Sequence, residues 1–271
     1  MIARPVVSSQ RFGPWAVVTG ASDGIGRAFA VELAAAGLKL VLVARRQAVL
    51  DALADELRRR HGVSCQTLAL DLALPDAMPR LAAATDALDV GLLVAAAGFG
   101  SAGPLLAQPA RDETDMLDVN CRAVLAQCLH FGPRLVQRRR GGIVLLSSLV
   151  AFHGTPWSAN YAATKAYVQS LAEGLRVEWL GQGVEVLACA PGPVATGFAG
   201  RARMTLGRSS TPEVVARQTL AALGRRGTVR PGALSKLLGW GLGMAPRAWR
   251  VALMGRIMQG MAAPPVPAAR Q

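Results

Sequence analysis

The chain has 271 residues, of which 52% are hydrophobic and 17% charged, so it can bury a sizeable core and is not an intrinsically disordered protein. Its four cysteines have no CxxC spacing and its three histidines are scattered, which argues against a structural zinc site or a disulfide framework and favours a reducing, cytoplasmic compartment. The net charge of +13 comes from arginines spread along the chain, not from one basic stripe with aromatic residues, so we expect no nucleic-acid binding.

Short apolar runs alternate with amphipathic helical stretches from residue 15 to about residue 230. The expected strands cover 15–19, 39–44, 63–70, 89–95, 142–147 and 184–190. The expected helices cover 27–36, 47–60, about 111–137 and 158–180. Strands that are apolar throughout and separated by helices indicate a parallel sheet buried on both faces. We therefore predict a doubly wound, Rossmann-like α/β domain with its ligand at the carboxyl ends of the strands.

An apolar segment rich in arginine follows the expected dinucleotide-binding and catalytic domain of residues 1–230. Residues 231–271 should form a helical extension, broken at Pro246, and a loose tail over 264–271. Its arginines argue against a bilayer-spanning helix, and residues 1–13 lack the apolar run of a signal peptide. Three roles stay open for the extension: a lid over the substrate pocket or a dimer surface, an amphipathic anchor on anionic lipid, or packing on the sheet.

The turn after the first expected strand is rich in glycine, since residues 19–26 read TGASDGIG. A strand–turn–helix of this kind aims free backbone N–H groups and the positive end of a helix at an anion, and glycine lets the backbone approach phosphates closely. The spacing is GxxxGxG, not GxGxxG, and an ordinary tight turn is the alternative. The turn follows the first strand of a chain in which strands and helices alternate, and this position favours a phosphate-binding site for a dinucleotide.

Two arginines, Arg45 and Arg46, follow the second expected strand, where NAD-binding folds usually carry an acidic residue for the ribose 2′-hydroxyl. A guanidinium can bind a 2′-phosphate with two hydrogen bonds, whereas a carboxylate would repel it, so NADP(H) is favoured over NAD(H). The alternative is that both arginines face solvent. Asp71, after the third strand, could accept a hydrogen bond from the adenine amino group or cap a helix that starts near Pro75.

A serine, a tyrosine and a lysine form a candidate catalytic set. Tyr161 and Lys165 are four residues apart on one expected helix, so their side chains share a face. An ammonium beside a phenol lowers the phenol's pKa, which would make Tyr161 a usable general acid or base. Ser148, at the end of the fifth strand, could hydrogen-bond the reacting oxygen, and Ser147 is the alternative hydroxyl. The alternative is that Tyr161 and Lys165 are only a surface pair without a role in catalysis.

Several motifs occur together and in order: TGASDGIG at 19–26, Asp-Val-Asn at 118–120, Ser148, YAATK at 161–165 and PGPVAT at 191–196. In this arrangement the chain resembles the short-chain dehydrogenase/reductase family from residue 14 to about residue 200. The resemblance implies an oxidoreductase that transfers a hydride between NADP(H) and a carbonyl or secondary alcohol, while the protein supplies position and proton chemistry.

The resemblance also implies roles for individual residues. Tyr161 would protonate the carbonyl oxygen in reduction or deprotonate the alcohol in oxidation. Lys165 would lower the pKa of Tyr161 and bind the nicotinamide ribose. Ser148 would hold the substrate oxygen, and Asn120 would bind a water of a proton relay. The residues implied in cofactor binding lie at the strand ends and are Thr19, Gly20, Ser22, Asp23, Gly24, Ile25, Gly26, Arg45, Arg46, Asp71, Leu72, Ala96, Gly98, Tyr161, Lys165, Pro191, Gly192, Val194 and Thr196.

One segment departs from the family pattern. The family usually has Asn-Asn-Ala-Gly after the fourth strand, whereas residues 95–98 here read AAAG. We expect weaker cofactor binding or a repacked sheet edge in consequence, with activity retained. The departure also keeps open an alternative function, a catalytically silent cofactor-binding protein with a regulatory or interaction role.

The segments expected to read the substrate are mostly apolar, which favours a bulky hydrophobic ketone, aldehyde or acyl chain. The candidate substrate residues are Phe99, Leu149, Phe152, His153, Trp157 and Phe198. No metal site is expected. The family resemblance implies a homodimer or homotetramer, and the extension allows peripheral contact with a membrane.

Overall fold

The computed structural model of the protein describes residues 7–205, 207, 209–233, 235–237, 241 and 246–261. Within these residues the strands are β1 Trp15–Thr19, β2 Lys39–Ala44, β3 Cys65–Ala69, β4 Val90–Ala95, β5 Gly141–Leu146, β6 Val184–Cys189 and β7 Thr228–Val229. They form one parallel sheet in the order β3-β2-β1-β4-β5-β6-β7. The predicted doubly wound α/β fold is confirmed, and the strand order reverses between β1 and β4, the point where such sheets bind ligands.

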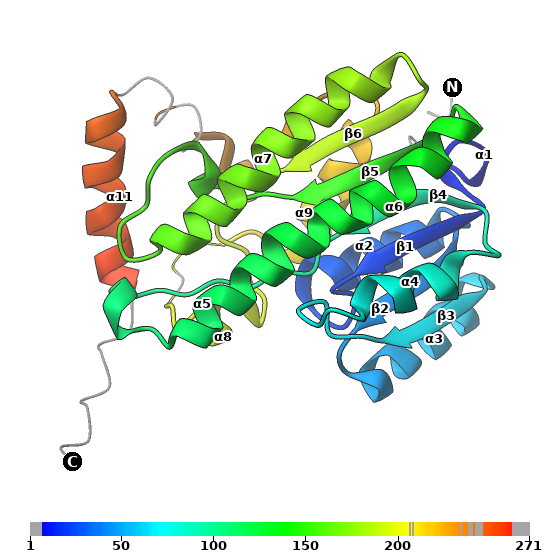
Figure 1. Cartoon of the computed structure of the whole chain (residues 1–271), viewed down its shortest axis with the longest axis horizontal. Helices are drawn as coiled ribbons and strands as arrows, with labels where there is room; N and C mark the ends of the chain where they lie inside the picture. The colour runs from blue at the N-terminus through cyan, green and yellow to red at the C-terminus, as the bar shows by residue number, and fades with distance from the viewer. Residues whose placement is uncertain are drawn as a thin grey trace.

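The α-helices are α1 Ser9–Phe12, α2 Gly24–Ala35, α3 Gln47–His61, α4 Ala77–Thr85, α5 Ala110–Leu117, α6 Ala123–Arg138, α7 Ala159–Leu180, α8 Phe198–Arg201, α9 Pro212–Ala222 and α11 Arg247–Met261. Short 3-10 turns cover Leu105–Ala107 and Leu149–Phe152. Figure 1 shows α4, α6 and α7 in front of the sheet and α2 and α9 behind it. The molecule therefore has three layers.

The core is divided by the sheet, because successive strand residues point to opposite faces. In β1, Ala16 and Val18 pack in the cluster that includes α2, α3 and α9. Val17, between them, packs in the cluster that includes α4, α6 and α7. This burial on both sides explains why the strands are apolar at every position and not at alternate positions.

Several expected boundaries differ from the observed ones. The second helix from the N-terminus begins at Gly24, three residues before the expected 27, and β3 is shorter than the expected 63–70. The helix expected over 111–137 is interrupted by a π-helical turn, Asp118–Arg122, which joins α5 to α6 and carries Asn120. Such turns recur at functional sites. The sequence analysis named a helix near Pro75, where α4 begins, but it did not predict α1, α8, α9 or β7.

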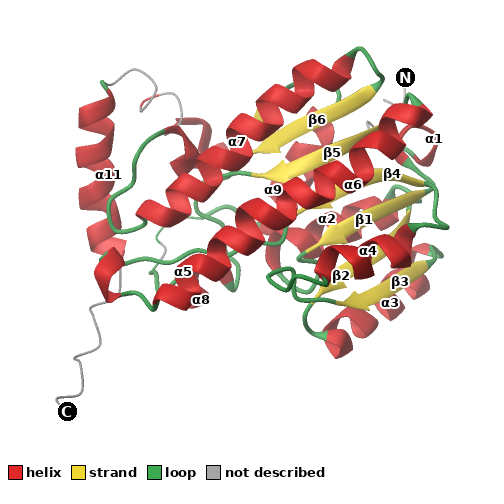
Figure 2. Ribbon diagram, in the orientation of Figure 1, coloured by secondary structure: helices red, strands yellow, loops and turns green. Residues whose placement is uncertain are grey.

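The C-terminal extension is described in part. Figure 2 shows α11 as a separate helix beyond the arrowheads of β5 and β6, the carboxyl ends of those strands. The helix expected before Pro246 and the tail 264–271 lie largely or wholly outside the described residues. In the described part of the chain, no helix combines the length and apolarity needed to cross a bilayer.

Candidate active site

The glycine-rich turn joins β1 to α2 at the carboxyl edge of the sheet. Gly20 and Gly24 have φ values of 71° and 53°, a region that favours glycine. A Cβ on Gly20 would lie 2.8 Å from the backbone nitrogen of Ala97, and one on Gly24 would lie 2.8 Å from Cγ2 of Thr196. The turn therefore packs directly on the segments after β4 and β6, and only glycine fits these two positions. Asp23 caps α2, since Gly24 N–H donates to its Oδ1 at 2.7 Å.

Two arginines, Arg45 and Arg46, directly follow the last residue of β2. Nη2 of Arg46 donates to the backbone oxygen and the hydroxyl of Ser22, both at 3.2 Å, which ties it to the glycine-rich turn. Nη1 of Arg45 lies 3.9 Å from Oδ2 of Asp71, and the Arg45 side chain is 57% exposed. Asp71 accepts from Ala73 N–H at 3.0 Å, so it closes a turn and does not cap a helix. Arg45 is thus held loosely at the cavity and is available to a phosphate.

Asn120 fixes the segment after β4 to the π-helical turn. The side chain is buried, and its Nδ2 donates to Phe99 O at 2.9 Å and to Thr164 Oγ1 at 3.0 Å. Its Oδ1 accepts from Phe99 N–H at 3.1 Å. Asn120 Oδ1 and Lys165 Nζ would lie 3.0 and 3.3 Å from a Cβ on Gly98. The amide of Asn120 is therefore occupied by protein groups, and we assign it a positioning role.

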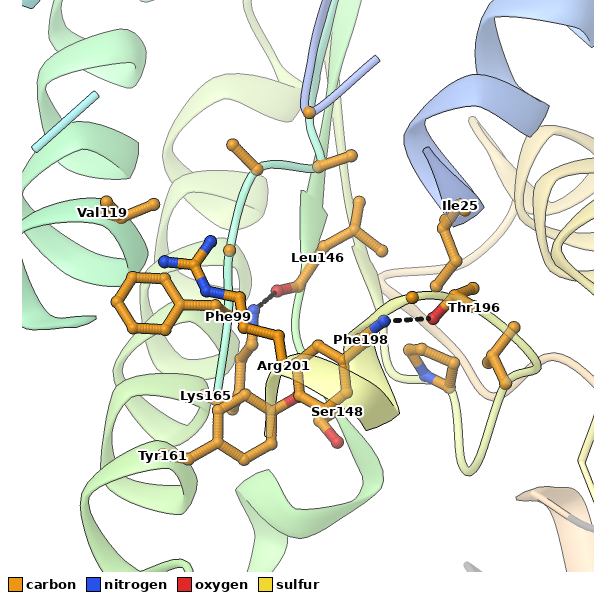
Figure 3. A pocket seen from close by; sticks show the side chains of 18 of the residues that line it. Ile25, Phe99, Val119, Leu146, Ser148, Tyr161, Lys165, Thr196, Phe198 and Arg201 are labelled. Atoms are coloured by element: carbon orange, nitrogen blue, oxygen red, sulfur yellow. Dashed lines mark hydrogen bonds between the residues drawn. The ribbon is translucent and has the colours of Figure 1, made fainter. Parts of the chain in front are cut away.

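The two serines at the end of β5 have different partners. The Ser147 hydroxyl donates to Lys165 O at 3.1 Å and so ties β5 to α7. The Ser148 hydroxyl accepts from Val150 N–H at 3.4 Å and is close enough to Tyr161 to lower the pKa of its phenol. Figure 3 shows Ser148 beside the ring of Tyr161, with Lys165 close to both. Between the two serines, the geometry favours Ser148 as the hydroxyl that acts with Tyr161.

The pKa of Tyr161 differs from the expectation drawn from the sequence. Burial raises it to about 12, and the hydrogen bond with Ser148 offsets only part of that rise. The Lys165 ammonium lies 5.8 Å from the Tyr161 ring centroid and donates to Leu146 O at 2.7 Å. Burial lowers the pKa of Lys165 to about 8. Desolvation therefore dominates the pKa of Tyr161, and the phenol stays protonated at neutral pH.

The substrate side of the site is walled by aromatic and apolar groups. The rings of Tyr161 and Phe198 lie 5.4 Å apart, and the guanidinium of Arg201 stacks 3.9 Å above the ring of Phe99. Figure 3 shows these four side chains around one space. Two expected substrate residues do not line this cavity. The Phe152 ring centroid lies 4.3 Å from the guanidinium carbon of Arg230. Trp157 has a φ of 66°, and its carbonyl accepts a hydrogen bond from Gly103 N–H at 2.7 Å.

His153 is a buried polar group on this wall. The side chain lines the cavity, and neither of its ring nitrogens has a hydrogen-bond partner among the described residues. Burial lowers its pKa, and the positive charges of Arg250 and Arg247 lower it further. The imidazole is therefore neutral near pH 7, so one of its ring nitrogens can donate a hydrogen bond and the other can accept one.

Helix α11 closes one side of the cavity. The sequence analysis had left three roles open for the extension that contains this helix, and a lid over the cavity was one of them. The apolar lining residues of α11 are Leu253, Met254, Ile257, Met258 and Met261. Thr205 N–H donates to Met261 O at 2.9 Å, which ties the end of α11 to the segment after α8. These residues are spaced at the helical period along 253–261. This spacing could have predicted that one face of the helix would line a cavity.

One cavity of about 520 Å³ joins the glycine-rich turn to the Ser148–Tyr161 pair and to α11. Among the candidate residues, those that line it are Gly20, Ser22, Asp23, Gly24, Ile25, Gly26, Arg45, Arg46, Asp71, Leu72, Ala96, Gly98, Phe99, Ser148, Leu149, His153, Tyr161, Lys165, Pro191, Gly192, Val194, Thr196 and Phe198. Thr19 lies beneath the surface, where its hydroxyl accepts from Ala97 N–H at 3.4 Å. Arg201 and Val119 are lining residues that the sequence analysis missed. The described residues contain no group of three or more His, Cys, Asp or Glu side chains suited to a metal ion.

Known proteins resemble this chain in sequence and in structure. Residues 14–206 match the family model described as short chain dehydrogenase. A very-long-chain 3-oxoacyl-CoA reductase of Phaeosphaeria nodorum is 34% identical over 249 residues, which are 89% of this chain and 73% of that protein. A solved 7beta-hydroxysteroid dehydrogenase superposes with a TM-score of 0.84 at 27% identity, over 91% of this chain and 98% of the other. A short-chain dehydrogenase from Sphingobium yanoikuyae, solved in complex with NADPH, gives a TM-score of 0.77 at 30% identity, over 96% of this chain and 98% of the other.

Proposed function

The chain belongs to the short-chain dehydrogenase/reductase family and is an oxidoreductase of that family, and we propose that it reduces a bulky hydrophobic ketone with NADPH or runs the reverse oxidation. The observation that carries this proposal is that Ser148, Tyr161 and Lys165 line one cavity together with the glycine-rich turn. Tyr161 supplies an acid at a place where a dinucleotide and an apolar substrate can meet.

The residues of the cavity fit NADP(H). The glycines of the turn keep Cβ atoms away from the N-terminal end of α2, which suits a pyrophosphate. Arg45 supplies an exposed guanidinium at the end of β2, where a 2′-phosphate would lie. The resemblance to the NADPH complex of the Sphingobium yanoikuyae enzyme supports the same cofactor. When bound, the cofactor supplies the hydride.

The protein's part in the reaction is positioning and proton transfer. With a pKa of about 12, Tyr161 is a proton donor at neutral pH, which suits reduction of a carbonyl. Ser148 would hold the carbonyl oxygen within reach of that proton. The ammonium of Lys165 would stabilise the phenolate that forms as the proton leaves. Tyr161 then regains a proton from solvent before the next turnover.

The rate of reduction should fall as pH rises through about 8. The lowered pKa of Lys165 means that its ammonium is present below about pH 8 and is lost above it. Tyr161 remains protonated throughout this range, so the decline in rate reports the deprotonation of Lys165. We expect kcat/KM for reduction to decline by up to about tenfold per pH unit above this point, because kcat/KM reports the free enzyme. A flat profile to pH 10 would contradict the assigned role of Lys165.

Changing Arg45 to aspartate should shift cofactor preference toward NADH. A carboxylate at the 2′-phosphate position would repel NADPH and could accept from the 2′-hydroxyl of NADH. We expect the ratio of NADPH affinity to NADH affinity to fall at least about tenfold, measured by fluorescence titration of both cofactors. Arg60→Asp, at the exposed end of α3, makes the same charge change away from the cavity and is the control. An unchanged ratio in Arg45→Asp would show that Arg45 does not read the phosphate.

The substrate class follows from the cavity walls and from the relatives. Phe99, Leu149, Phe198 and the residues of α11 give a mostly apolar surface, while His153 could hydrogen-bond a second oxygen of the substrate. The relatives are named for a very-long-chain 3-oxoacyl-CoA and for a hydroxysteroid, and both names describe large hydrophobic carbonyl or hydroxyl compounds.

A substrate panel tests the proposed reaction. Consumption of NADPH is followed with long-chain 3-oxoacyl thioesters, steroid ketones and small ketones such as acetone. We expect turnover with at least one large hydrophobic class and a kcat/KM at least about 10²-fold lower for small ketones, because these leave the apolar walls uncovered. Binding of NADPH without turnover of any ketone would favour the silent cofactor-binding alternative. Absence of NADPH binding would overturn both.

The same proposal includes self-association and a cytoplasmic location. Leu129 on α6 and Tyr167 and Val177 on α7 are exposed apolar groups on helices that cover one face of the sheet. A homodimer or homotetramer through these helices would cover them. The four cysteines are free, which suits a reducing compartment. Light scattering should return a dimer or tetramer mass, and Leu129→Glu with Val177→Glu should lower it, whereas a monomeric wild type would exclude this interface.

A further inference from the structure

Helix α11 carries an exposed apolar stripe. Trp249, Leu253 and Ile257 are spaced four residues apart, so they follow one face of the helix. They are 74%, 46% and 40% exposed, respectively. The opposite side packs on the protein: Met258 is buried, and Gly255 and Val251 lie against Pro156 and Gly154. The outward stripe, Trp249–Leu253–Ile257, thus remains largely exposed among the described residues.

The charged residues of α11 and of the sequence on either side of it have one sign. After Glu213 the sequence contains no Asp or Glu up to its last residue, while it contains nine Lys or Arg residues. Arg256 is seven residues, or two helical turns, after Trp249, and so lies on the same side of the helix. Arg256 and Arg247 are both exposed. An apolar stripe bordered by arginine, on a helix that carries no acidic residue, complements an anionic bilayer and would repel a basic surface.

The stripe is continuous with the mouth of the cavity. Leu253 and Ile257 both line the cavity and remain exposed at its rim, while Trp249 lies farther along the same face and does not line it. Figure 1 shows α11 at one end of the molecule, beyond the carboxyl ends of the strands. A bilayer that contacted the stripe would therefore meet the protein at the opening of its active-site cavity.

We propose that the outward stripe of α11 docks the protein on an anionic phospholipid surface, with Trp249, Leu253 and Ile257 at the level of the acyl-chain boundary and Arg256 at the headgroups. This is interfacial binding by three exposed apolar side chains of one helix and needs no spanning segment. Trp suits this depth because its ring is apolar and its N–H is polar. The docking does not depend on the proposed reaction. If that reaction also holds, docking brings lipid-dissolved substrate to the cavity mouth.

Vesicle flotation of the full chain tests the proposal. Vesicles of phosphatidylcholine with phosphatidylglycerol should carry the protein to the top of the gradient, and those of pure phosphatidylcholine should carry much less. Tryptophan emission should shift to shorter wavelength with the anionic vesicles only. Raising salt toward 1 M should weaken the binding, since the screening length falls to about 3 Å.

Paired variants locate the binding on α11. Trp249→Ser with Arg256→Gln should weaken vesicle binding at least about tenfold, because it removes a large apolar group and one headgroup contact. Neither residue lines the cavity, so turnover of a water-soluble ketone should be unchanged. Val49→Ser with Arg59→Gln makes matched changes on α3 and should leave binding intact. A thermal melt that matches wild type excludes misfolding as the cause of any loss.

Three results would overturn the proposal. Equal binding to anionic and neutral vesicles would remove the role of charge. Full binding by the Trp249 and Arg256 double variant would place the contact elsewhere. A wild-type oligomer that loses mass in the double variant, with no vesicle binding in either protein, would show that a second copy of the chain covers the stripe.

Discussion

Replacing Tyr161 with phenylalanine is expected to lower kcat at least about 10³-fold, because it removes the proton donor and leaves the ring in place. The Phe198 ring and the backbone around Gly100 contact the ring of Tyr161, and these contacts persist in the variant. NADPH affinity should change by less than about threefold, since the glycine-rich turn and Arg45 are untouched. Stopped-flow or steady-state NADPH consumption with a large ketone measures the first quantity, and fluorescence titration the second.

The chain offers a matched control for this change. Its only other tyrosine, Tyr167, lies on the same helix α7 and is 39% exposed. Tyr167 does not line the cavity, so Tyr167→Phe should keep wild-type turnover. Comparable activity in Tyr161→Phe and wild type would remove the phenol from the chemistry and favour a different proton source.

Replacing Lys165 with methionine is expected to lower kcat at least about 10²-fold. Methionine fills a similar volume but has no charge to stabilise the phenolate of Tyr161. It also leaves Leu146 O without the donor that now lies at 2.7 Å, so a loss of stability of about 1–3 kcal/mol should accompany the kinetic effect. The kinetic loss should be larger than any change in KM, because the substrate walls stay intact.

Lys39 separates a local effect of Lys165 from a general effect of lysine removal. Its ammonium lies 5.8 Å from the Trp15 ring centroid, the same separation as Lys165 from Tyr161, but Lys39 is at the opposite end of the strands and exposed. Lys39→Met should retain activity. Retained activity in Lys165→Met as well, in a protein with the wild-type melting temperature, would show that the ammonium has no part in turnover.

The sheet could be predicted from the sequence because β1, β2, β4, β5 and β6 are buried on both faces and their residues are apolar at nearly every position. The strand β7 could not, because two residues, Thr228 and Val229, carry no pattern. A usable signal was missed at α9: Thr211 caps the helix, Pro212 follows at its first position and Glu213 lies in the first turn.

The cofactor side of the site was predictable to a greater extent than the substrate side. The cofactor-side residues lie at strand ends or on one face of α7, and these include the glycines of the turn, Arg45, Ser148, Tyr161 and Lys165. The positions of strand ends and the helical period therefore suffice to place them at the carboxyl edge of the sheet. The substrate side depends on packing between distant segments, such as α11 against the turn after β5. Sequence order could not show that Phe152 would stack with Arg230 while Met258 would reach the cavity.

The pKa of Tyr161 illustrates a limit of spacing arguments. The four-residue separation from Lys165 correctly places the ammonium near the ring, at 5.8 Å. Spacing does not report how much water the fold removes, and burial raises the pKa of Tyr161 and lowers that of Lys165. The raised pKa of Tyr161 keeps the phenol protonated at neutral pH.

Isotope transfer tests the central claim most directly. NADPH deuterated at both C4 positions of the nicotinamide is incubated with a large hydrophobic ketone, and the alcohol product is examined by mass spectrometry. Wild type should place deuterium on the carbinol carbon, and Tyr161→Phe should form almost no product although it binds the cofactor. Alcohol without deuterium, or equal labelled product from both proteins, would contradict hydride transfer assisted by Tyr161.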